Sequence, residues 1–150
     1  MKVVIQRCAQ ASVTIGNKIH SNIGKGLLVL LGIEALDEQS DVSWLIGKLI
    51  ALRIFSDEDG KMNHSIEDVN GSFLVVSQFT LHASTKKGNR PSYTQAARPE
   101  VAIPLYEYFV SELKIESNLT VETGVFEADM QIGLINDGPV TIIIDSKNRV

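Results

Sequence analysis

The segment "QIGLINDGPVTIII", residues 131–144, decides how the end of this chain folds. Two apolar, β-branched runs flank Asn136-Asp137-Gly138-Pro139, and the proline stands where the second run begins. Proline cannot donate a hydrogen bond to a β ladder, so within a sheet it belongs at an edge, a strand start or a bulge. The local sequence favours a hairpin, because Asp-Gly is a preferred two-residue turn. The alternative is that the backbone of Gly138 and Pro139 is itself a functional surface.

Outward from this segment, most of the chain has the composition of β-strands. Apolar and β-branched runs bounded by Gly, Asn and Asp predict strands. The predicted strands cover 2–15 with a bend near 9–11, two segments within 19–33 that break at 24–26, then 72–81, 119–123, 130–135 and 140–145. The segment 72–81, "SFLVVSQFTL", is almost continuously apolar, which suits burial on both faces of a sheet.

Two segments have helical periodicity instead. Apolar residues recur on one helix face at Val42, Leu45, Ile46, Leu49 and Ile50. Asp37 or Ser40 is available as the N-cap of this helix. A second helix is predicted on "EVAIPLYEYFVSELK", residues 100–114, and to begin close to Pro104, because proline inside a helix removes a hydrogen bond and clashes with the preceding turn. The order strands, helix, strand, helix, strands predicts an α+β domain with helices packed over a sheet.

Length and composition indicate one domain, residues 1–150, that can bury a core without disulfides or metal. The single cysteine, Cys8, has no partner for an internal disulfide, which favours a reducing compartment and a buried position on a strand. The N-terminus lacks the apolar region of a signal peptide, and the longest apolar run, residues 26–33, is too short to span a bilayer. These features predict a cytoplasmic protein with no membrane partner.

Charge argues against a protein that coats nucleic acid through its whole surface, because the net charge is −4 and the pI is about 5.3. One local basic stretch exists between residues 82 and 99, and it contains no acidic residue. Its cations are Lys86, Lys87, Arg90 and Arg98. Such a stretch is consistent with an ordinary solvated loop or with a contact to an RNA backbone.

Familiar catalytic signatures are absent: the sequence has no G-x-S-x-G, no G-x-x-x-x-G-K-[ST] and no G-x-G-x-x-G. The three histidines have no metal-ligand spacing, so neither a metal nor a cofactor is predicted. The best local candidate is "SQFTL", residues 77–81, at the end of a buried strand. Alternation along a strand would place Gln78 and Thr80 on one face and Ser77 and Phe79 on the other. A hydroxyl nucleophile needs a neighbouring base, and the sequence offers none beside Thr80.

Read together, several segments resemble one family, the D-aminoacyl-tRNA deacylases. The resemblance covers almost the whole chain and depends on the order and spacing of the motifs, each of which is weak alone. The motifs are "QR" at 6–7, "GLLVLLG" at 26–32, "RIFSDEDGKMN" at 53–63, "SQFTL" at 77–81, "RPSY" at 90–93, "ADMQ" at 128–131 and "NDGPVT" at 136–141.

The resemblance implies a barrel-like β/β/α arrangement of mixed and antiparallel sheets with two main helices, assembled as a two-fold homodimer. It implies a cis peptide at Gly138-Pro139 that projects into the partner's active site and rejects L-amino acids by contact. Arg7 would orient this element. Residues 77–80 would line the opposite side of the site, with Thr80 acting through its backbone N–H, and Phe126 and Met130 would bind the terminal adenosine.

The activity implied is hydrolysis of the ester between a D-amino acid, or mischarged glycine, and tRNA, assisted by the ribose 2′-hydroxyl of the substrate and without a cofactor. If the RNA supplies a reacting group, the protein needs only to position and polarise the ester, which agrees with the missing catalytic triad. Two alternatives remain open at this point. One is a dimeric nucleic-acid-binding protein without catalysis, and the other is a Thr80 hydrolase of small esters.

Overall fold

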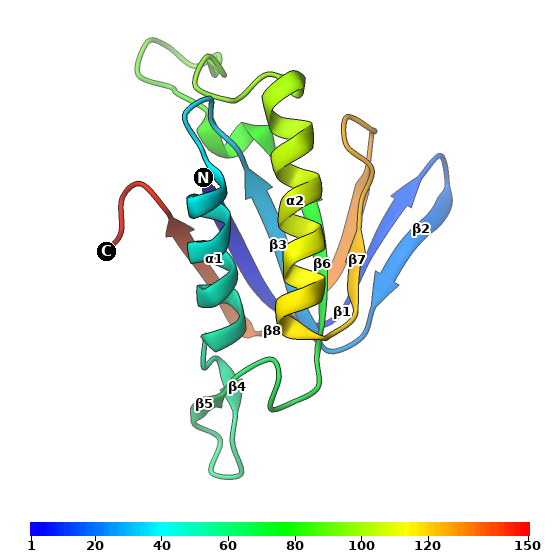
Figure 1. The fold of residues 1–150 in the computed structure, drawn as a ribbon. Coiled ribbons are helices and arrows are strands. Elements are labelled where there is room, and N and C mark those ends of the chain that lie inside the picture. Colours follow the sequence, from blue (N-terminus) through cyan, green and yellow to red (C-terminus); the bar gives the residue numbers. More distant parts are fainter.

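A single mixed sheet carries both main helices on one of its faces (Figure 1). The computed structural model describes residues 1–150. The strands of the sheet are β1 (Lys2–Ile15), β2 (Lys18–Ile23), β3 (Gly26–Gly32), β6 (Ser72–Ser77), β7 (Val121–Thr123) and β8 (Gln131–Asp145). The helices are α1 (Gln39–Ala51), α2 (Pro99–Ser117) and the short 3₁₀ helix η1 (Phe79–His82). A small hairpin of β4 (Phe55–Ser56) and β5 (Met62–His64) lies apart from the sheet. The α+β class predicted from the sequence is confirmed.

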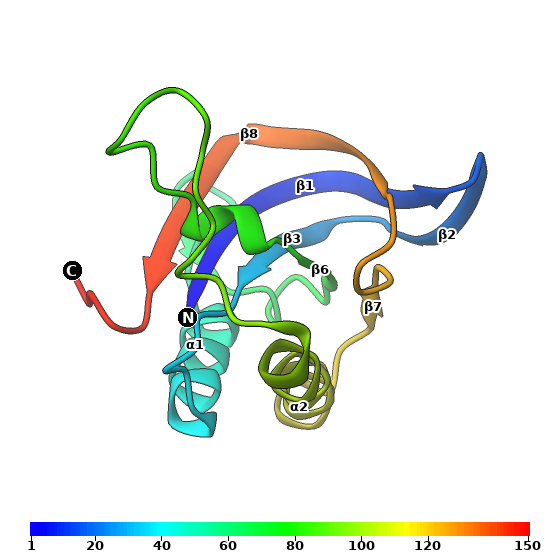
Figure 2. The same ribbon diagram turned by 90° about the horizontal axis from the view of Figure 1, so that it is seen from above.

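Strand β1 organises the sheet because it pairs on both of its sides. It runs antiparallel to β3 through its first half and to β2 through its second half, while β8 follows its other edge over nearly its whole length. Strands β3, β6 and β7 are parallel to one another. The sheet curls until the Ser21 hydroxyl on β2 donates a hydrogen bond to the Thr123 carbonyl on β7, at 2.7 Å. The result is the barrel-like shape that Figure 2 shows above the two helices.

Strand β8 corrects the hairpin interpretation of the C-terminal segment. The two apolar runs are not folded against each other; both pair with β1 in one antiparallel ladder from Lys2↔Asp145 to Thr14↔Gln131. The four residues 137–140 stand opposite Arg7 alone, between the pairs Gln6↔Thr141 and Cys8↔Asn136. Strand β1 is long enough to pair with the backbone N–H and C=O groups of both runs at once. This pairing outweighs the local preference of Asp-Gly for a turn. We call residues 137–140 the bulge.

The core forms on both faces of the sheet. Alternate residues of β1, β3 and β6, such as Val3, Val29 and Phe73, pack against α1 and α2. On the other face a smaller cluster contains Cys8, Leu28 and Leu74, closed over by residues of β8. Strand β6 contributes to both clusters, as its continuous apolar sequence predicted, but it ends at Ser77 rather than at residue 81.

Both helices differ from their predicted starts. Helix α1 has Glu38 at its N-cap, whose N–H donates to the Asp41 carboxylate at 2.9 Å, so neither Asp37 nor Ser40 is the cap. Helix α2 begins at Pro99, and Pro104 lies inside it on the exposed side. The only carbonyl that Pro104 leaves without its helical partner is that of Glu100, in the first turn and on the same exposed surface, so water satisfies it at little cost. Neither helix is long and apolar enough to cross a membrane.

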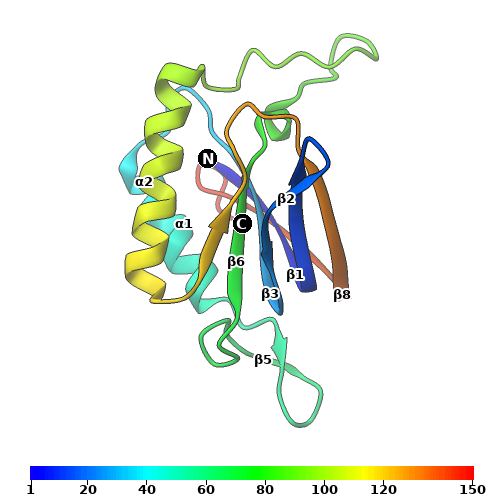
Figure 3. The same cartoon turned by 90° about the vertical axis from the view of Figure 1, so that its right-hand side faces the viewer.

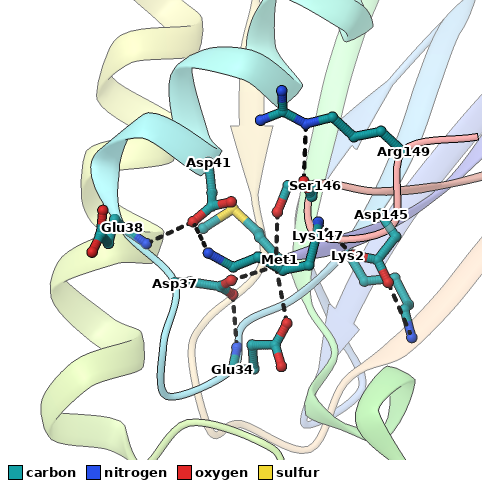
Figure 4. A network of polar contacts seen from close by, with 10 residues as sticks. All are labelled: Met1, Lys2, Glu34, Asp37, Glu38, Asp41, Asp145, Ser146, Lys147 and Arg149. Carbon is teal, nitrogen blue, oxygen red and sulfur yellow. Dashed lines mark hydrogen bonds and ion pairs between the residues drawn. The ribbon is translucent and has the colours of Figure 1, made fainter.

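A polar network joins both ends of the chain to α1 (Figure 4). The buried α-ammonium of Met1 donates to the buried Asp37 carboxylate and, at 3.0 Å, to the Ser146 hydroxyl. Asp41 accepts a hydrogen bond from the Lys147 ammonium at 2.8 Å. The guanidinium of Arg149 lies 4.4 Å from the centre of the Trp44 ring. These contacts fix the segment after β8 and hold the β1–β8 pair against α1.

Replacing Asp41 by asparagine is expected to lower the free energy of unfolding at neutral pH by about 1–3 kcal/mol, because a buried charge-assisted hydrogen bond is lost. Burial by itself raises the pKa of Asp41, but hydrogen bonds from Lys147 and the Glu38 N–H outweigh it and lower this pKa to about 2. A carboxyl group whose pKa is lowered in the folded state stabilises the fold at pH values above its usual pKa near 4. This contribution to stability is lost as the pH falls towards 2. Urea unfolding at several pH values should therefore give a shallower acid dependence for Asp41→Asn. The same substitution at the exposed Asp59 is the control, and parallel acid profiles for the Asp41 variant and the parent would contradict the assignment.

Candidate active site

The segment Ser77–Thr80 lies where β6 ends and η1 begins, beside the end of β3 (Figure 3). The Gln78 N–H still donates to the Leu31 carbonyl at 2.8 Å, and Phe79 then starts the 3₁₀ helix. The strand stops at Ser77, so strand alternation does not extend to Thr80 as predicted. The side chains of Gln78 and Thr80 nevertheless lie together, because the Gln78 side-chain amide donates to the Thr80 hydroxyl at 2.5 Å.

A pocket of about 470 Å³ opens beside this segment. It lies between the entry to η1, the chain that leads into α2 and the loop before β8. Its lining is mainly apolar and comprises Leu31, Ile33, Ser77, Gln78, Phe79, Tyr93, Ala96, Ala97, Arg98, Pro99, Ala102, Phe126 and Glu127. The sequence predicted Ser77, Gln78, Phe79 and Phe126 for the site, and the fold brings all four together here.

Aromatic side chains give the pocket its shape. Phe79 and Tyr93 meet edge to face, with ring centroids 5.1 Å apart, and Phe79 is 56% exposed. Phe126 packs edge to face on Tyr106 at 5.8 Å. The Tyr106 hydroxyl donates to the Val75 carbonyl at 2.9 Å, and its burial raises the pKa of the phenol to about 12, so Tyr106 stays neutral at physiological pH. Exposed aromatic faces of this kind are suited to contact with a nucleoside base.

The first turn of η1 presents backbone donors. Its first internal hydrogen bond is donated by Leu81 to the Gln78 carbonyl, so the N–H groups of Phe79 and Thr80 have no acceptor within the helix. Donors of this kind stabilise the negative oxygen that develops when an ester is attacked. Thr80 can therefore act through its backbone while its hydroxyl is engaged by Gln78.

Ionisable groups are few in the pocket. Among its lining residues only Tyr93, Arg98 and Glu127 carry one, and Glu127 is exposed. No group of three His, Cys, Asp or Glu residues is placed to hold a metal ion. The pocket can bind, orient and polarise an ester, and Glu127 is its only carboxylate.

Arg7 holds the bulge from inside the protein. Its side chain is 8% exposed; its Nε donates to the Asp137 carbonyl at 2.8 Å and its Nη1 to the Ile54 carbonyl at 2.5 Å. The guanidinium thus joins the bulge to the segment that follows α1. The peptide bond between Gly138 and Pro139 is cis, and both residues are exposed.

The bulge and the pocket lie apart in one chain. Ser77 pairs with Leu31, which pairs in turn with Val3, so the pocket lies level with the start of β1. The bulge stands opposite Arg7, four residues further along β1 and about 13 Å away in that direction. Neither Gly138 nor Pro139 lines the pocket.

The other predicted site residues lie in three places. Lys86, Lys87 and Arg90 are exposed on the loop between η1 and α2, which projects from the body of the molecule in Figure 1. Arg98 lies apart from these three residues, because it is the N-cap residue of α2 and lines the pocket. Met130 does not line the pocket; it packs against the smaller core cluster, with its sulfur directly beside Gly124.

Several pocket residues were missed from the sequence. Tyr93 belongs to the "RPSY" motif but carried no assigned role, and Glu127 gave no signal in a loop of mixed composition. Ala96 and Ala97 line the pocket because the Ala97 N–H donates to the Ile33 carbonyl at 2.9 Å and holds this segment beside the pocket. Such long-range contacts cannot be read from the sequence.

Comparison with known proteins gives one consistent result. The family model described as D-Tyr-tRNA(Tyr) deacylase matches residues 4–145. Curated proteins named D-aminoacyl-tRNA deacylase from Flavobacterium psychrophilum and Cytophaga hutchinsonii are 63% and 62% identical over 149 residues, which is 99% of each chain.

Solved structures agree in fold. One, named c-Myc DNA Unwinding Element Binding Protein, is 41% identical and has a TM-score of 0.91, with 97% of this chain and 98% of that chain covered. Another, of a probable eukaryotic D-amino acid tRNA deacylase, has a TM-score of 0.82 at 18% identity, covers 95% of this chain and 97% of that chain, and shows likeness of fold alone.

Proposed function

Since this chain belongs to the family of D-aminoacyl-tRNA deacylases, we propose that it holds the scissile ester between its own pocket and the bulge of a second subunit. It is a hydrolase that deacylates D-aminoacyl-tRNA. The homodimer, the selection of chirality by Gly138-Pro139, the acceptance of glycyl-tRNA and the participation of the RNA are our proposals. With charged tRNA as its substrate, we place the protein in the cytoplasm.

The separation of bulge and pocket is the observation that carries this proposal. An exposed backbone element is held by a buried arginine, yet it stands about 13 Å along the sheet from the pocket of its own chain. Both hydrogen bonds of this arginine go to backbone carbonyls, and its Nε also lies 3.8 Å from the Asp137 carboxylate of the bulge, so Arg7 serves to position that backbone. A two-fold dimer can bring the bulge of one subunit to the pocket of the other, and each subunit then completes its partner's site.

Selection in such a site works by contact with backbone. The carbonyl oxygens around Gly138 and Pro139 would face the α-carbon of the bound amino acid and leave room there for hydrogen only. A D-residue, or glycine, presents hydrogen on that side, whereas an L-residue presents its side chain and clashes. This filter rejects one enantiomer without reading the side chain, so it serves many D-amino acids.

The pocket would receive the 3′-terminal adenosine. Phe79, Tyr93 and Phe126 supply aromatic surface for the base, whereas Met130 packs against the smaller core cluster. The ester carbonyl then lies at η1, where the N–H groups of Phe79 and Thr80 stabilise the developing oxyanion. The neighbouring ribose 2′-hydroxyl assists the attack of water on the ester carbonyl, the bond between the acyl carbon and the 3′ oxygen breaks, and the free amino acid and the 3′-hydroxyl of the tRNA are released. No protein nucleophile is required.

Exposed cations extend this surface towards the rest of the tRNA. Lys86, Lys87 and Arg90 project on the loop between η1 and α2, and Arg98 lies at the mouth of the pocket. Contacts of such residues with phosphates strengthen binding in a salt-dependent way without reading sequence. One similar structure belongs to a protein named for binding a DNA element. Salt-dependent binding to duplex DNA as tight as binding to tRNA would favour that second function for the loop.

Replacing Thr80 by alanine is expected to lower the rate of D-Tyr-tRNA hydrolysis by less than about tenfold. The substitution removes one hydrogen bond, that from Gln78, which is worth about 1 kcal/mol, and keeps the backbone N–H. Thr80→Pro removes that N–H in the first helical turn, where proline is tolerated, and should cost about 100-fold or more. Single-turnover deacylation distinguishes them, with circular dichroism to verify folding. A loss of several orders of magnitude in Thr80→Ala would make the hydroxyl a nucleophile.

A further inference from the structure

The side chain of Asn136 closes the base of the bulge. Its Oδ1 accepts a hydrogen bond from the Val140 N–H at 2.9 Å, and its Nδ2 donates to the Thr141 hydroxyl at 3.1 Å. One amide thus joins the residue before the bulge to the last residue of the bulge and to the residue after it. No other side chain bonds to both ends of this segment.

The Asn136 side-chain amide supplies a hydrogen bond that the ladder between β1 and β8 does not supply at Val140. Residues 137–140 have only Arg7 opposite them, so Val140 has no partner on β1 for its N–H. Proline at 139 has no N–H to contribute to a turn within the bulge. The Asn136 carbonyl oxygen therefore replaces the missing ladder acceptor for Val140, and this fixes where the chain re-enters the sheet.

The base of the bulge is also tied to β1. The Thr141 hydroxyl accepts a second hydrogen bond, from the Gln6 side-chain amide at 3.3 Å, and Gln6 is the ladder partner of Thr141. Asn136 is itself paired with Cys8. The two ends of the bulge are thus held in register with the residues on each side of Arg7.

Arg7 and Asn136 restrain different parts of the same loop. Arg7 is buried and binds the Asp137 carbonyl, at the first residue of the bulge. Asn136 binds Val140, at the last residue, through one hydrogen bond that is partly buried. Arg7 restrains only the first residue of the bulge, whereas Arg7 and Asn136 together restrain the first and the last and so limit the directions in which the carbonyl oxygens of Gly138 and Pro139 can point.

We propose that Asn136 is a positioning residue for stereochemical selection, which acts by fixing the Gly138-Pro139 backbone through Val140 and Thr141. The proposal rests on the proposed function of the bulge as the chirality filter. The bond to Thr141 is exposed and the bond to Val140 is only partly buried, so their loss changes global stability little, while a small rotation of the bulge changes the space left for an L-residue.

The test measures selectivity and local order together in four variants: Asn136→Ala, Asn136→Asp, Thr141→Val and the control Gln131→Ala. Asn136→Ala loses both bonds. Asn136→Asp keeps an acceptor for Val140 and can accept from the Thr141 hydroxyl. Thr141→Val keeps the bond between Asn136 and Val140 but removes both bonds to the Thr141 hydroxyl, that from Asn136 and the longer one from Gln6. Gln131 is exposed on the same strand.

For Asn136→Ala we expect the ratio of kcat/KM for D-Tyr-tRNA to that for L-Tyr-tRNA to fall at least about tenfold, and amide hydrogen exchange at Val140 to accelerate at least about tenfold. Asn136→Asp should restore most of both quantities. Thr141→Val should lower the ratio less than Asn136→Ala does, and Gln131→Ala should equal the parent. Thr141→Val also keeps the test decisive if Asn136→Ala does not fold.

Gly138→Ala, measured in the same assays, separates the failure of this inference from the failure of the proposed function. If Gly138→Ala impairs turnover but Asn136→Ala retains the parental D/L ratio, Asn136 does not position the filter. Faster exchange at Val140 with an unchanged ratio has the same meaning. If Gly138→Ala also behaves as the parent, the bulge is not the filter and the proposed function is wrong.

Discussion

Gly138→Ala is expected to lower kcat/KM for D-Tyr-tRNA about 100-fold or more while the fold is retained. Gly138 has φ of +140°, a conformation that residues with a side chain rarely adopt. An added Cβ would lie 2.8 Å from Cγ2 of Val140 and 3.0 Å from Nη2 of Arg7. The backbone of the bulge must therefore move, and a displacement near 1 Å is enough to misplace the ester. Hydrolysis of glycyl-tRNA should fall as well, because the surface itself has shifted.

Gly133→Ala is the matched control, since Gly133 lies on the same strand without a positive φ. Its Cβ would meet only the Ser12 hydroxyl oxygen, at 3.3 Å. We expect this variant to deacylate D-Tyr-tRNA within a few-fold of the parent. If Gly138→Ala is as active as Gly133→Ala and still refuses L-Tyr-tRNA, stereochemical selection lies elsewhere.

Mixing Gly138→Ala with a variant whose pocket is filled, such as Ala96→Trp, tests whether the site crosses the subunit boundary. In a mixed dimer one site combines both defects, while the other combines an intact pocket with an intact bulge. A cross-subunit site therefore regains activity after subunit exchange, although each parent variant is inactive. A site contained within one chain would regain none, because each chain carries one defect. A protein that remains a monomer with full activity at micromolar concentration also excludes the shared site.

A D-aminoacyl-tRNA whose terminal adenosine lacks the 2′-hydroxyl, with the amino acid on the 3′ position, is expected to bind normally but to react about 100- to 10,000-fold more slowly. The reason is the composition of the pocket, which no histidine or cysteine lines and which lies beside the backbone donors at the start of η1. Under the proposed function, the hydroxyl that assists the reaction comes from the substrate. Single-turnover rates with matched normal and 2′-deoxy substrates, together with their dissociation constants, measure the effect.

Glu127 provides the decisive control, because it is the only carboxylate that lines the pocket. If the RNA supplies the reacting group, Glu127→Gln should hydrolyse D-Tyr-tRNA within about tenfold of the parent rate. A much larger loss in Glu127→Gln, with normal turnover of the 2′-deoxy substrate, would assign general-base catalysis to the protein.

Most elements of the fold could be predicted from local patterns. Strands β1, β2 and β3 lie where β-branched runs and glycines placed them, and the periodic apolar residues Val42, Leu45, Ile46 and Leu49 are buried on α1. The errors fall at the boundaries of elements and in the pairing of residues 131–144, for which the local sequence favoured a hairpin. Pro104 did not begin α2, because on an exposed first turn water can replace the lost hydrogen bond.

The site was predicted in part. The resemblance and the position of "SQFTL" at the end of a buried strand identified Ser77, Gln78 and Phe79, which line the pocket. Tyr93, Ala97 and Glu127 could not be found in this way. These residues belong to the loop between η1 and α2 and to the segment before β8. Long-range contacts, such as the hydrogen bond between Ala97 and Ile33, place them near the end of β6.

The sequence alone determined the type and approximate place of most strands and of both main helices, and that Gly138-Pro139 interrupts a β-branched run, because period and composition depend on neighbours along the chain. It could not determine that the two halves of this run share β1 as their partner, and it favoured a hairpin instead. Only the tertiary structure decided that question. Pairing with β1 satisfies both runs in one ladder and leaves residues 137–140 as a bulge between Arg7 and Asn136. Strand partners are chosen by burial and hydrogen bonding across more than a hundred residues of sequence, which no local pattern records.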